Sequence, residues 1–187
     1  MNSPANRGVL LVDGARYEEA FTWLYERYAE HSILPLLSGT DYEPIAEAGP
    51  ILIDAPQGST PHHAWRSGTD MQSAIWLESE RSAEELWAML QRRLRILAPD
   101  GREYWLRIAD AQPLYQAWSD GAQWPDGFWH GVERVWLLHQ GNIFCAWHNR
   151  SPQHDAAPLN TGIDAQLTLD WPLLEALART AETTQEV

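Results

Sequence analysis

Short apolar runs alternate with a helical pattern along the first half of the chain. The run GVLLVD at residues 8–13 is apolar up to an Asp-Gly pair, which is typical of a buried strand that ends in a turn. Apolar runs at 51–54 and 73–79 predict two further strands. Apolar residues that recur every three or four positions over 17–30 predict an amphipathic helix. Residues 55–72 are rich in Pro, Gly, Ser and Thr, so we expect a long exposed loop there.

The second half of the chain carries clearer signals for where elements begin and end. Ser82 and Glu85 form a capping box before a helix whose leucines recur on one face. A hairpin is expected over 95–110, because Pro-Asp-Gly in its middle favours a tight turn. A short helix over 112–119 and a second hairpin over 128–147, with Gln-Gly-Asn at its tip, complete this part.

The remaining segments carry weaker patterns. Residues 33–50 are expected to be mostly loop with one helical turn, and residues 149–166 are expected to form a linker. Asp170 is placed to cap a last helix, and Pro172 is tolerated in the first turn of a helix. The final segment, TAETTQEV, is expected to fray.

Strands interleaved with helices and hairpins favour a mixed α/β or α+β fold. We expect a single sheet with flanking helices and a smaller C-terminal portion made of a hairpin and a helix. The corresponding division places a main domain at 1–148, and the linker with the last helix at 149–187. A chain of 187 residues is long enough to form a sizeable core without disulfides or metals.

Charge and composition exclude several classes of function. The formal net charge is −13, which repels nucleic acids and anionic membranes, so neither is expected as a partner. All 13 basic residues are arginine, and the absence of lysine excludes a P-loop and Schiff-base chemistry. The N-terminal apolar run, Val9 to Val12, is too short for a signal peptide or a membrane span, so we expect a cytoplasmic protein.

No group of residues makes a convincing catalytic or metal site. Cys145 is the only cysteine, and its pairing with His148 as nucleophile and base is disfavoured because residues three apart in a strand point to opposite faces. We therefore interpret Cys145 as a buried structural residue. Asp13 could be catalytic at a strand end, but a turn is the simpler reading. The histidines considered as zinc ligands lack the spacing of a zinc site: His62, His63, His130, His139 and His148. We therefore expect no catalytic residues, no metal and no cofactor.

Arg107 and Asp110 lie close together where the expected strand gives way to the next helix. A fixed Arg–Asp pair holds a bend well, because a guanidinium and a carboxylate can form two parallel hydrogen bonds. The alternative is a clamp for a ligand. We favour a structural pair that ties the strand end to the helix.

Eleven tryptophans need an explanation. Four lie in patterns that predict core positions: Trp23, Trp76, Trp87 and Trp105. A further group with Pro and Gly between its members suggests a protein-binding surface, a carbohydrate platform or the core of a subdomain. The candidates for protein binding are Tyr115, Trp118, Trp124, Trp129 and Trp136. Trp118, Trp124 and Trp129 lead this group.

Three segments together resemble a known family. LLVDGAR, then PLLSGTDYEPIAEAGPILID, then AIWLESERSAEELWAMLQRRLRILAPDGREYWLRIADAQPLY are similar, in order and spacing, to the effector chaperones of type VI secretion, also called Tap or TEC adaptors. The resemblance covers residues 8 to about 138. It implies a protein without enzymatic activity that binds a toxic effector in the cytoplasm and helps to load it onto the VgrG spike, in some cases with a PAAR tip.

Two other functions compete with the adaptor hypothesis. A carbohydrate-binding module could use exposed tryptophans, but the absence of a signal peptide argues against it. A small hydrolase could use Asp13 with a histidine, but no nucleophile has a placed base. The adaptor hypothesis is therefore the first of the three.

Overall fold

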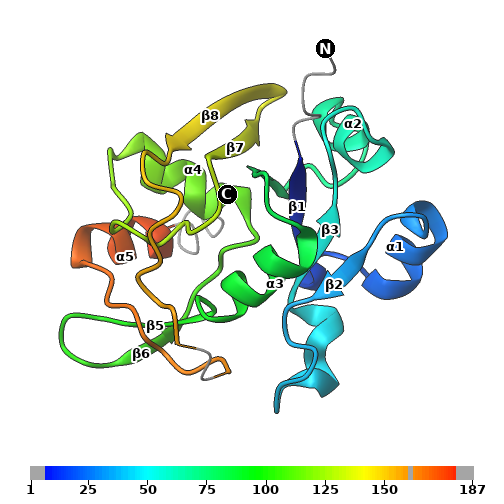
Figure 1. The fold of residues 1–187 in the computed structure, drawn as a ribbon. Helices are drawn as coiled ribbons and strands as arrows, with labels where there is room; N and C mark the ends of the chain where they lie inside the picture. The colour runs from blue at the N-terminus through cyan, green and yellow to red at the C-terminus, as the bar shows by residue number, and fades with distance from the viewer. Residues whose placement is uncertain (1–6, 160–161, 180–187) are drawn as a thin grey trace, which may run out of the picture.

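The computed structural model describes residues 7–159 and 162–179, and its elements follow one another in a mixed order along the chain (Figure 1). In chain order the elements are β1 (Gly8–Asp13), η1 (Gly14–Arg16), α1 (Ala20–Tyr28), β2 (Ile33–Pro35), η2 (Glu43–Ala48), β3 (Pro50–Asp54), α2 (Thr60–Arg66), β4 (Ile75–Glu78), α3 (Ala83–Gln91), β5 (Arg95–Leu97), β6 (Glu103–Trp105), α4 (Ala111–Ser119), β7 (Arg134–His139), β8 (Asn142–His148) and α5 (Trp171–Ala178). The predicted fold class, α+β with flanking helices, is confirmed.

Six strands form the central sheet in the order β2-β3-β1-β4-β7-β8, and all neighbouring pairs are antiparallel. Leu10 of β1 lies opposite Ile53 of β3 and Trp76 of β4. Strand β1 is buried along its whole length, which explains why its sequence is apolar without alternation. The expectation of a single sheet is wrong, because β5 and β6 form a separate two-stranded sheet.

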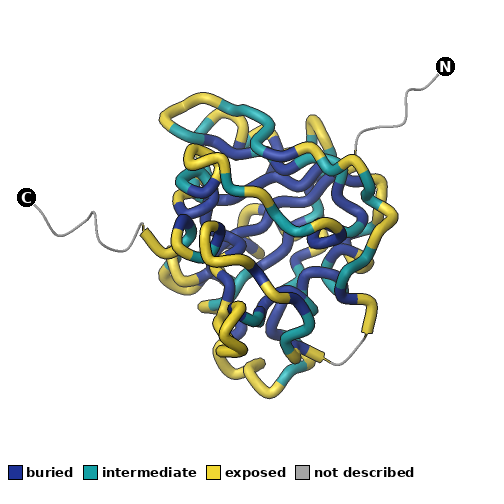
Figure 2. Tube along the Cα trace, turned by 90° about the vertical axis from the view of Figure 1, so that its left-hand side faces the viewer, coloured by how far each residue is buried: buried dark blue, intermediate teal, exposed yellow. Residues whose placement is uncertain are grey.

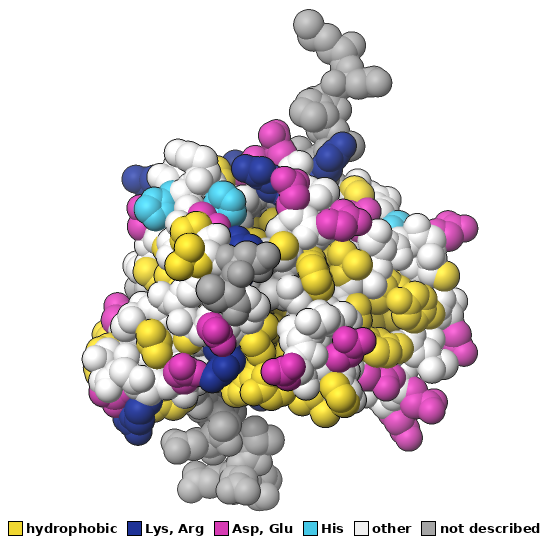
Figure 3. All heavy atoms as spheres, turned by 60° about the horizontal axis from the view of Figure 1, so that its bottom comes forward, with side chains coloured by type: hydrophobic (Ala, Val, Ile, Leu, Met, Phe, Trp, Pro, Cys, Tyr) yellow, Lys and Arg dark blue, Asp and Glu magenta, His cyan; other side chains and the backbone are white. Residues whose placement is uncertain are grey.

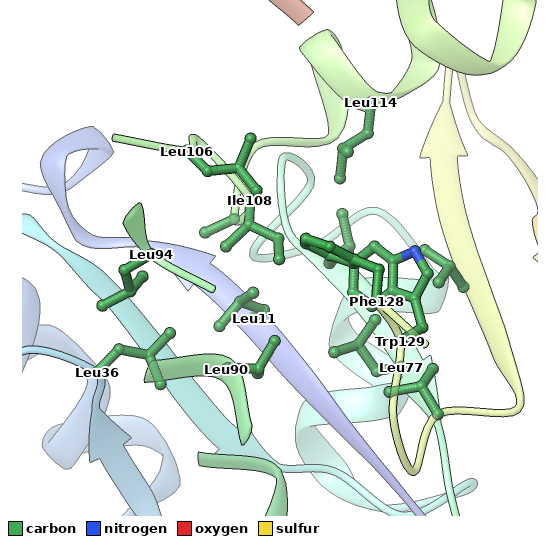
Figure 4. Packing of buried hydrophobic residues seen from close by; sticks show 14 of the residues in the cluster. Leu11, Leu36, Leu77, Leu90, Leu94, Leu106, Ile108, Leu114, Phe128 and Trp129 are labelled. Carbon is green, nitrogen blue, oxygen red and sulfur yellow. The ribbon is translucent and has the colours of Figure 1, made fainter. Parts of the chain in front are cut away.

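Helices cover both faces of the central sheet, and each face has its own core. Figure 1 shows α1 and α2 on one side of β1 and β3 and α3, α4 and α5 on the other. Leu10 and Val12 pack toward α1 and α2, whereas Leu11 packs toward α3. The larger core also holds Phe128 and Trp129 from the loop before β7 (Figure 4). Buried positions follow the strands through the interior, while exposed positions gather in the loops (Figure 2).

Local signals place most element boundaries correctly. The capping box is present, because the Ser82 hydroxyl accepts a bond from the Glu85 N–H and the Glu85 carboxylate accepts one from the Ser82 N–H. Asp170 caps α5 as expected, by accepting a bond from the N–H of Leu173. Gly101 adopts a φ of 84° at the turn of the β5–β6 hairpin, a conformation that favours glycine.

The segment 55–72 is the main correction to the predicted elements. Instead of an exposed loop it contains α2, which Ser59 caps by accepting a bond from the N–H of His62. His62 and Trp65 are buried against the sheet, so the polar composition of the segment describes only its outer side. Within 33–50 the structure also adds the short strand β2, which pairs with β3.

The segment after β8 is held firmly against the rest of the chain. Asp155 accepts hydrogen bonds from Arg93 at 2.6 Å and from Arg92 at 3.0 Å, both just after α3. Ala157 and Leu169 belong to the larger core. The C-terminal portion therefore shares a core with the part that we assigned to the main domain. The segment TAETTQEV lies outside the described residues.

Candidate protein-binding site

The five aromatic candidates lie in three separate places. Trp118 on α4 is 39% exposed, with Tyr115 half-buried beside it. Trp124 and Trp129 pack into the larger core, and Trp129 is only 4% exposed. Trp136 on β7 packs against the other core, on the opposite face of the sheet. The structure therefore does not bring these side chains together on one surface.

Tyr115 and Trp118 form a small aromatic patch with β7 and β8. Tyr115 stacks on His139 with 3.6 Å between ring centroids, and Trp118 lies 4.5 Å from Phe144. We call these four residues the Trp118 patch. Since Tyr115 and Trp118 lie on one helix and are fixed by ring contacts, the patch is a preformed apolar surface.

Trp124 and Trp129 belong to an aromatic cluster under the loop before β7. Trp124 stacks on Phe128 at 4.4 Å and contacts Trp129 edge-on at 5.2 Å and Trp147 at 5.8 Å. Both indole N–H groups are buried without an acceptor among the described residues. Of the three leading candidates, only Trp118 is exposed, because Trp129 is buried in the larger core and Trp124 is half-buried against it.

Trp136 lines a pocket of about 310 Å³ between α2 and the face of the sheet that α2 covers. Its indole N–H donates to Glu78 Oε2 at 2.8 Å, and Glu78 Oε1 accepts from Arg134 at 3.0 Å. His62 and Trp76 form further walls, with 4.6 Å between their rings. Burial lowers the pKa of His62, so this histidine is neutral near pH 7. The carboxylate in this pocket is thus already satisfied by the protein itself.

An apolar groove that the sequence did not reveal lies between the β5–β6 hairpin and α5. It has a volume of about 350 Å³, and we call it the α5 groove. Its main lining residues are Ile96, Tyr104, Trp105, Trp171, Leu174 and Leu177. Trp105, which we expected in the core, is 49% exposed here, because β6 is an edge strand and all three of its residues are exposed. Trp171 is 38% exposed at the start of α5.

The Arg107–Asp110 pair proves to be half of a four-residue ring of alternating charge. Arg107 Nη2 contacts Asp110 Oδ2 at 3.2 Å and Asp13 Oδ2 at 2.9 Å. Arg16 contacts Asp110 at 2.7 Å and lies 4.0 Å from Asp13. We call these four residues the ion-pair ring. The sequence signal was the pair of mirrored motifs Asp-Gly-Ala-Arg and Arg-Ile-Ala-Asp, each with opposite charges three residues apart.

The ring joins the end of β1 to the start of α4. Asp13 caps η1 through the N–H of Ala15, and Asp110 caps α4 through the N–H of Gln112. The side chain of Asp110 is 3% exposed, whereas that of Arg107 is 66% exposed. Each carboxylate thus combines a cap with ion pairs. The strand that we expected to lead directly into this bend ends earlier, at Trp105, so the pair links α4 to the end of β1 and not to the end of β6. Arg107 also contributes to the rim of the α5 groove.

We predict that Asp110→Ala lowers the free energy of unfolding by about 1–3 kcal/mol, because it removes a helix cap and two ion pairs at a buried position. Urea denaturation measures this change. Asp110→Asn can still cap the helix, so its free energy of unfolding is expected to fall by less than that of Asp110→Ala. Wild-type stability in Asp110→Ala would contradict the structural role of the pair.

The described residues that we considered as catalytic alternatives are not arranged as a nucleophile with a base. Cys145, which we expected to be buried, is only half-buried, because it lies on the edge strand β8. Its thiol donates to the carbonyl of Trp147 at 3.4 Å, and burial raises its pKa. Asp13 has the two arginines of the ion-pair ring beside its carboxylate. Among residues 7–159 and 162–179, no cluster of three or more His, Cys, Asp or Glu side chains could hold a metal ion.

A family model matches most of the chain. The matching model is a domain of unknown function, DUF4123, and the match covers residues 10–125. The chain belongs to the DUF4123 family. This family is known as an adaptor family for effectors of type VI secretion. Comparison with curated proteins gave no match, and neither did comparison with solved structures.

The DUF4123 match divides the surfaces described above. It spans β1 to α4, including the ion-pair ring and the β5–β6 wall of the α5 groove. Strands β7 and β8 and helix α5 lie beyond it. The Trp118 patch and the α5 groove are thus both built where the DUF4123 part meets the C-terminal part. No helix in the described part of the chain has the length and apolar character needed to cross a bilayer.

Proposed function

We propose that the chain is a cytoplasmic adaptor that binds a type VI secretion effector and helps to load it onto the VgrG spike, alone or with a PAAR tip. Its membership of the DUF4123 family supports this role. We further propose that it acts as a binding protein and not as an enzyme. The observation that carries the proposal is the presence of apolar aromatic surfaces on a chain from this adaptor family.

Two such surfaces are available, and they suit a carrier that must hold one protein and meet another. The Trp118 patch and the α5 groove lie on neighbouring helices, since α4 packs against α5. Exposed aromatic rings are the side chains that most often dominate binding energy at protein interfaces. The net charge of −13 favours partners or segments that are basic or apolar.

The test co-expresses the tagged chain with the toxin and spike genes found in its gene neighbourhood. We expect the toxin to co-purify with the chain, and we expect deletion of the chain's gene to abolish delivery of the toxin while other type VI effectors are still delivered. Trp118→Ala and Trp105→Ala, each shown to melt normally, measure how far each aromatic surface contributes.

Two results would contradict the proposal. One is a toxin that is delivered at normal levels without the chain. The other is a purified complex that never contains a toxin or spike protein although the chain is folded. A toxin that co-purifies equally well with both variants would keep the adaptor role and exclude both aromatic surfaces as its main contact.

A further inference from the structure

Helix α5 has the composition of a helix that is covered on all sides. Every residue from Trp171 to Ala178 except Glu175 is apolar. A helix of this kind is normally buried all round. Leu173 and Ala176 do point into the core, with 0% and 1% exposure. The described residues leave the other side of α5 open, since Trp171 is exposed and Leu174 is only half-buried.

The opposite wall of the α5 groove is also apolar and held in place. Tyr104 and Trp105 are 38% and 49% exposed, while Ile96 is fully buried beneath them. The Trp105 ring is fixed by an edge-on contact with Tyr42 at 4.9 Å and by Arg95, whose guanidinium carbon lies 5.8 Å from the ring centroid. The groove is therefore a preformed surface, which reduces the entropy lost when a partner binds.

Charges around the groove favour a basic partner. The arginines nearby are neutralised within the chain, because Arg95 pairs with Glu103 and Arg107 pairs with Asp13 and Asp110. Glu175 lines the groove and has no ion pair among the described residues. On the face that Figure 3 shows, acidic side chains and several arginines lie around the apolar areas. The net charge of −13 adds a long-range attraction for cations.

We propose that the α5 groove binds a basic amphipathic helix of the effector, with its apolar stripe in the groove and an arginine or lysine beside Glu175. This inference rests on the proposed adaptor function and names the chemistry of the client segment. A helix fits because Trp171, Leu174 and Ala178 recur on one side of α5 with the spacing that packs against a second helix.

The test uses two synthetic helical peptides of about 15 residues, one of leucine and lysine and one with glutamate at each lysine position. Fluorescence anisotropy measures their binding to the full chain. We expect the lysine peptide to bind at least about 10-fold more tightly than the glutamate peptide. Trp171→Ala should weaken binding of the lysine peptide about 10-fold or more. Glu175→Gln should reduce the difference in affinity between the lysine peptide and the glutamate peptide.

Matched variants separate the groove from general attraction between opposite charges. Tyr25→Ala removes a comparably exposed ring from α1, and Glu84→Gln removes an exposed carboxylate from α3. Both should bind the lysine peptide as the wild type does. Equal weakening by these controls, or an unchanged affinity in Trp171→Ala, would overturn the proposal. Tighter binding after deletion of 180–187 would also overturn it, since the groove would then belong to the chain's own tail.

Toxin co-purification distinguishes this inference from the adaptor role itself. Loss of the toxin in Trp171→Ala but not in Tyr25→Ala supports both. A toxin that stays bound to a folded Trp171→Ala variant overturns the groove as the client site and leaves the adaptor role standing. If the chain binds the lysine peptide but no toxin, the adaptor role is overturned. The proposal that the natural ligand of the groove is a helix of an effector is then overturned as well.

Discussion

Asp155→Ala is expected to lower the free energy of unfolding by about 3–5 kcal/mol, because it leaves a buried guanidinium without its counter-ion. Arg93 is 0% exposed, and its Nη2 lies 2.6 Å from Asp155 Oδ1. Its remaining bonds go to the carbonyl oxygens of Met89, Gly127 and Phe128, which cannot balance a positive charge. Urea denaturation followed by tryptophan fluorescence measures the loss.

The same pair predicts how stability depends on pH. Burial alone would raise the pKa of Asp155, but the hydrogen bonds from Arg93 and the Ala157 N–H outweigh it and lower the pKa. A carboxylate with a lowered pKa in the folded state stabilises the fold above its unfolded pKa of about 4. This contribution is lost as the pH falls from about 4 through the folded pKa. The loss of stability over that range should be smaller in Asp155→Ala than in the wild type.

Two further variants control for the loss of the aspartate side chain. Asp41→Ala, at an exposed position, should change the stability by less than about 0.5 kcal/mol. The double variant Arg93→Met with Asp155→Leu should recover part of the loss, because an apolar pair needs no counter-ion. The recovery is incomplete, because the carbonyl oxygens that accept from Arg93 lose that donor. Stability of Asp155→Ala within about 1 kcal/mol of the wild type would refute the role of the pair.

Trp129→Ala is expected to lower the free energy of unfolding by about 3–5 kcal/mol, because it opens a cavity in an aromatic cluster of the larger core. Trp118→Ala should cost about 1 kcal/mol or less, because the Trp118 ring is 39% exposed. Thermal and urea denaturation of both variants measure the difference. Loss of toxin in Trp129→Ala would then report unfolding and not a lost contact.

A conservative variant sharpens this comparison. Trp129→Phe keeps most of the ring and gives up an indole N–H that has no acceptor among the described residues, so it should cost less than Trp129→Ala. Trp129→Ala with wild-type stability would contradict the core assignment. Toxin binding that then fails in this stable variant would return Trp129 to the list of contact residues.

Signals confined to a few neighbouring residues were enough to predict much of the fold. The capping box at Ser82 and the Pro-Asp-Gly turn both appear where expected, because caps and turns depend on groups only two or three residues apart. The tip of the second hairpin at Gly141 and the helix capped by Asp170 are confirmed for the same reason. The predicted start of that hairpin at residue 128 is wrong, because residues 128–131 form turns and β7 begins at Arg134. The buried strand β1 could be predicted because it is apolar throughout.

Elements whose stability comes from distant contacts were missed or misplaced. Helix α2 has a polar sequence, and Trp65 becomes its buried anchor only because the sheet lies beneath it. Strand β2 has three residues and exists through its pairing with β3. The separation of β5 and β6 from the main sheet also depends on packing, since residues 167 and 169 bond to Leu97 in β5.

The candidate site shows the same division between sequence and structure. The sequence by itself determined the acidic charge, the number of tryptophans and the likeness to an adaptor family, because these are properties of residue types and their order. Only the tertiary structure decided which rings are exposed, that Arg107 and Asp110 join Asp13 and Arg16, and that α5 leaves one apolar side open. The physical reason is that exposure and ion pairing depend on tertiary contacts between segments that are far apart in the chain. Local sequence patterns do not specify those contacts.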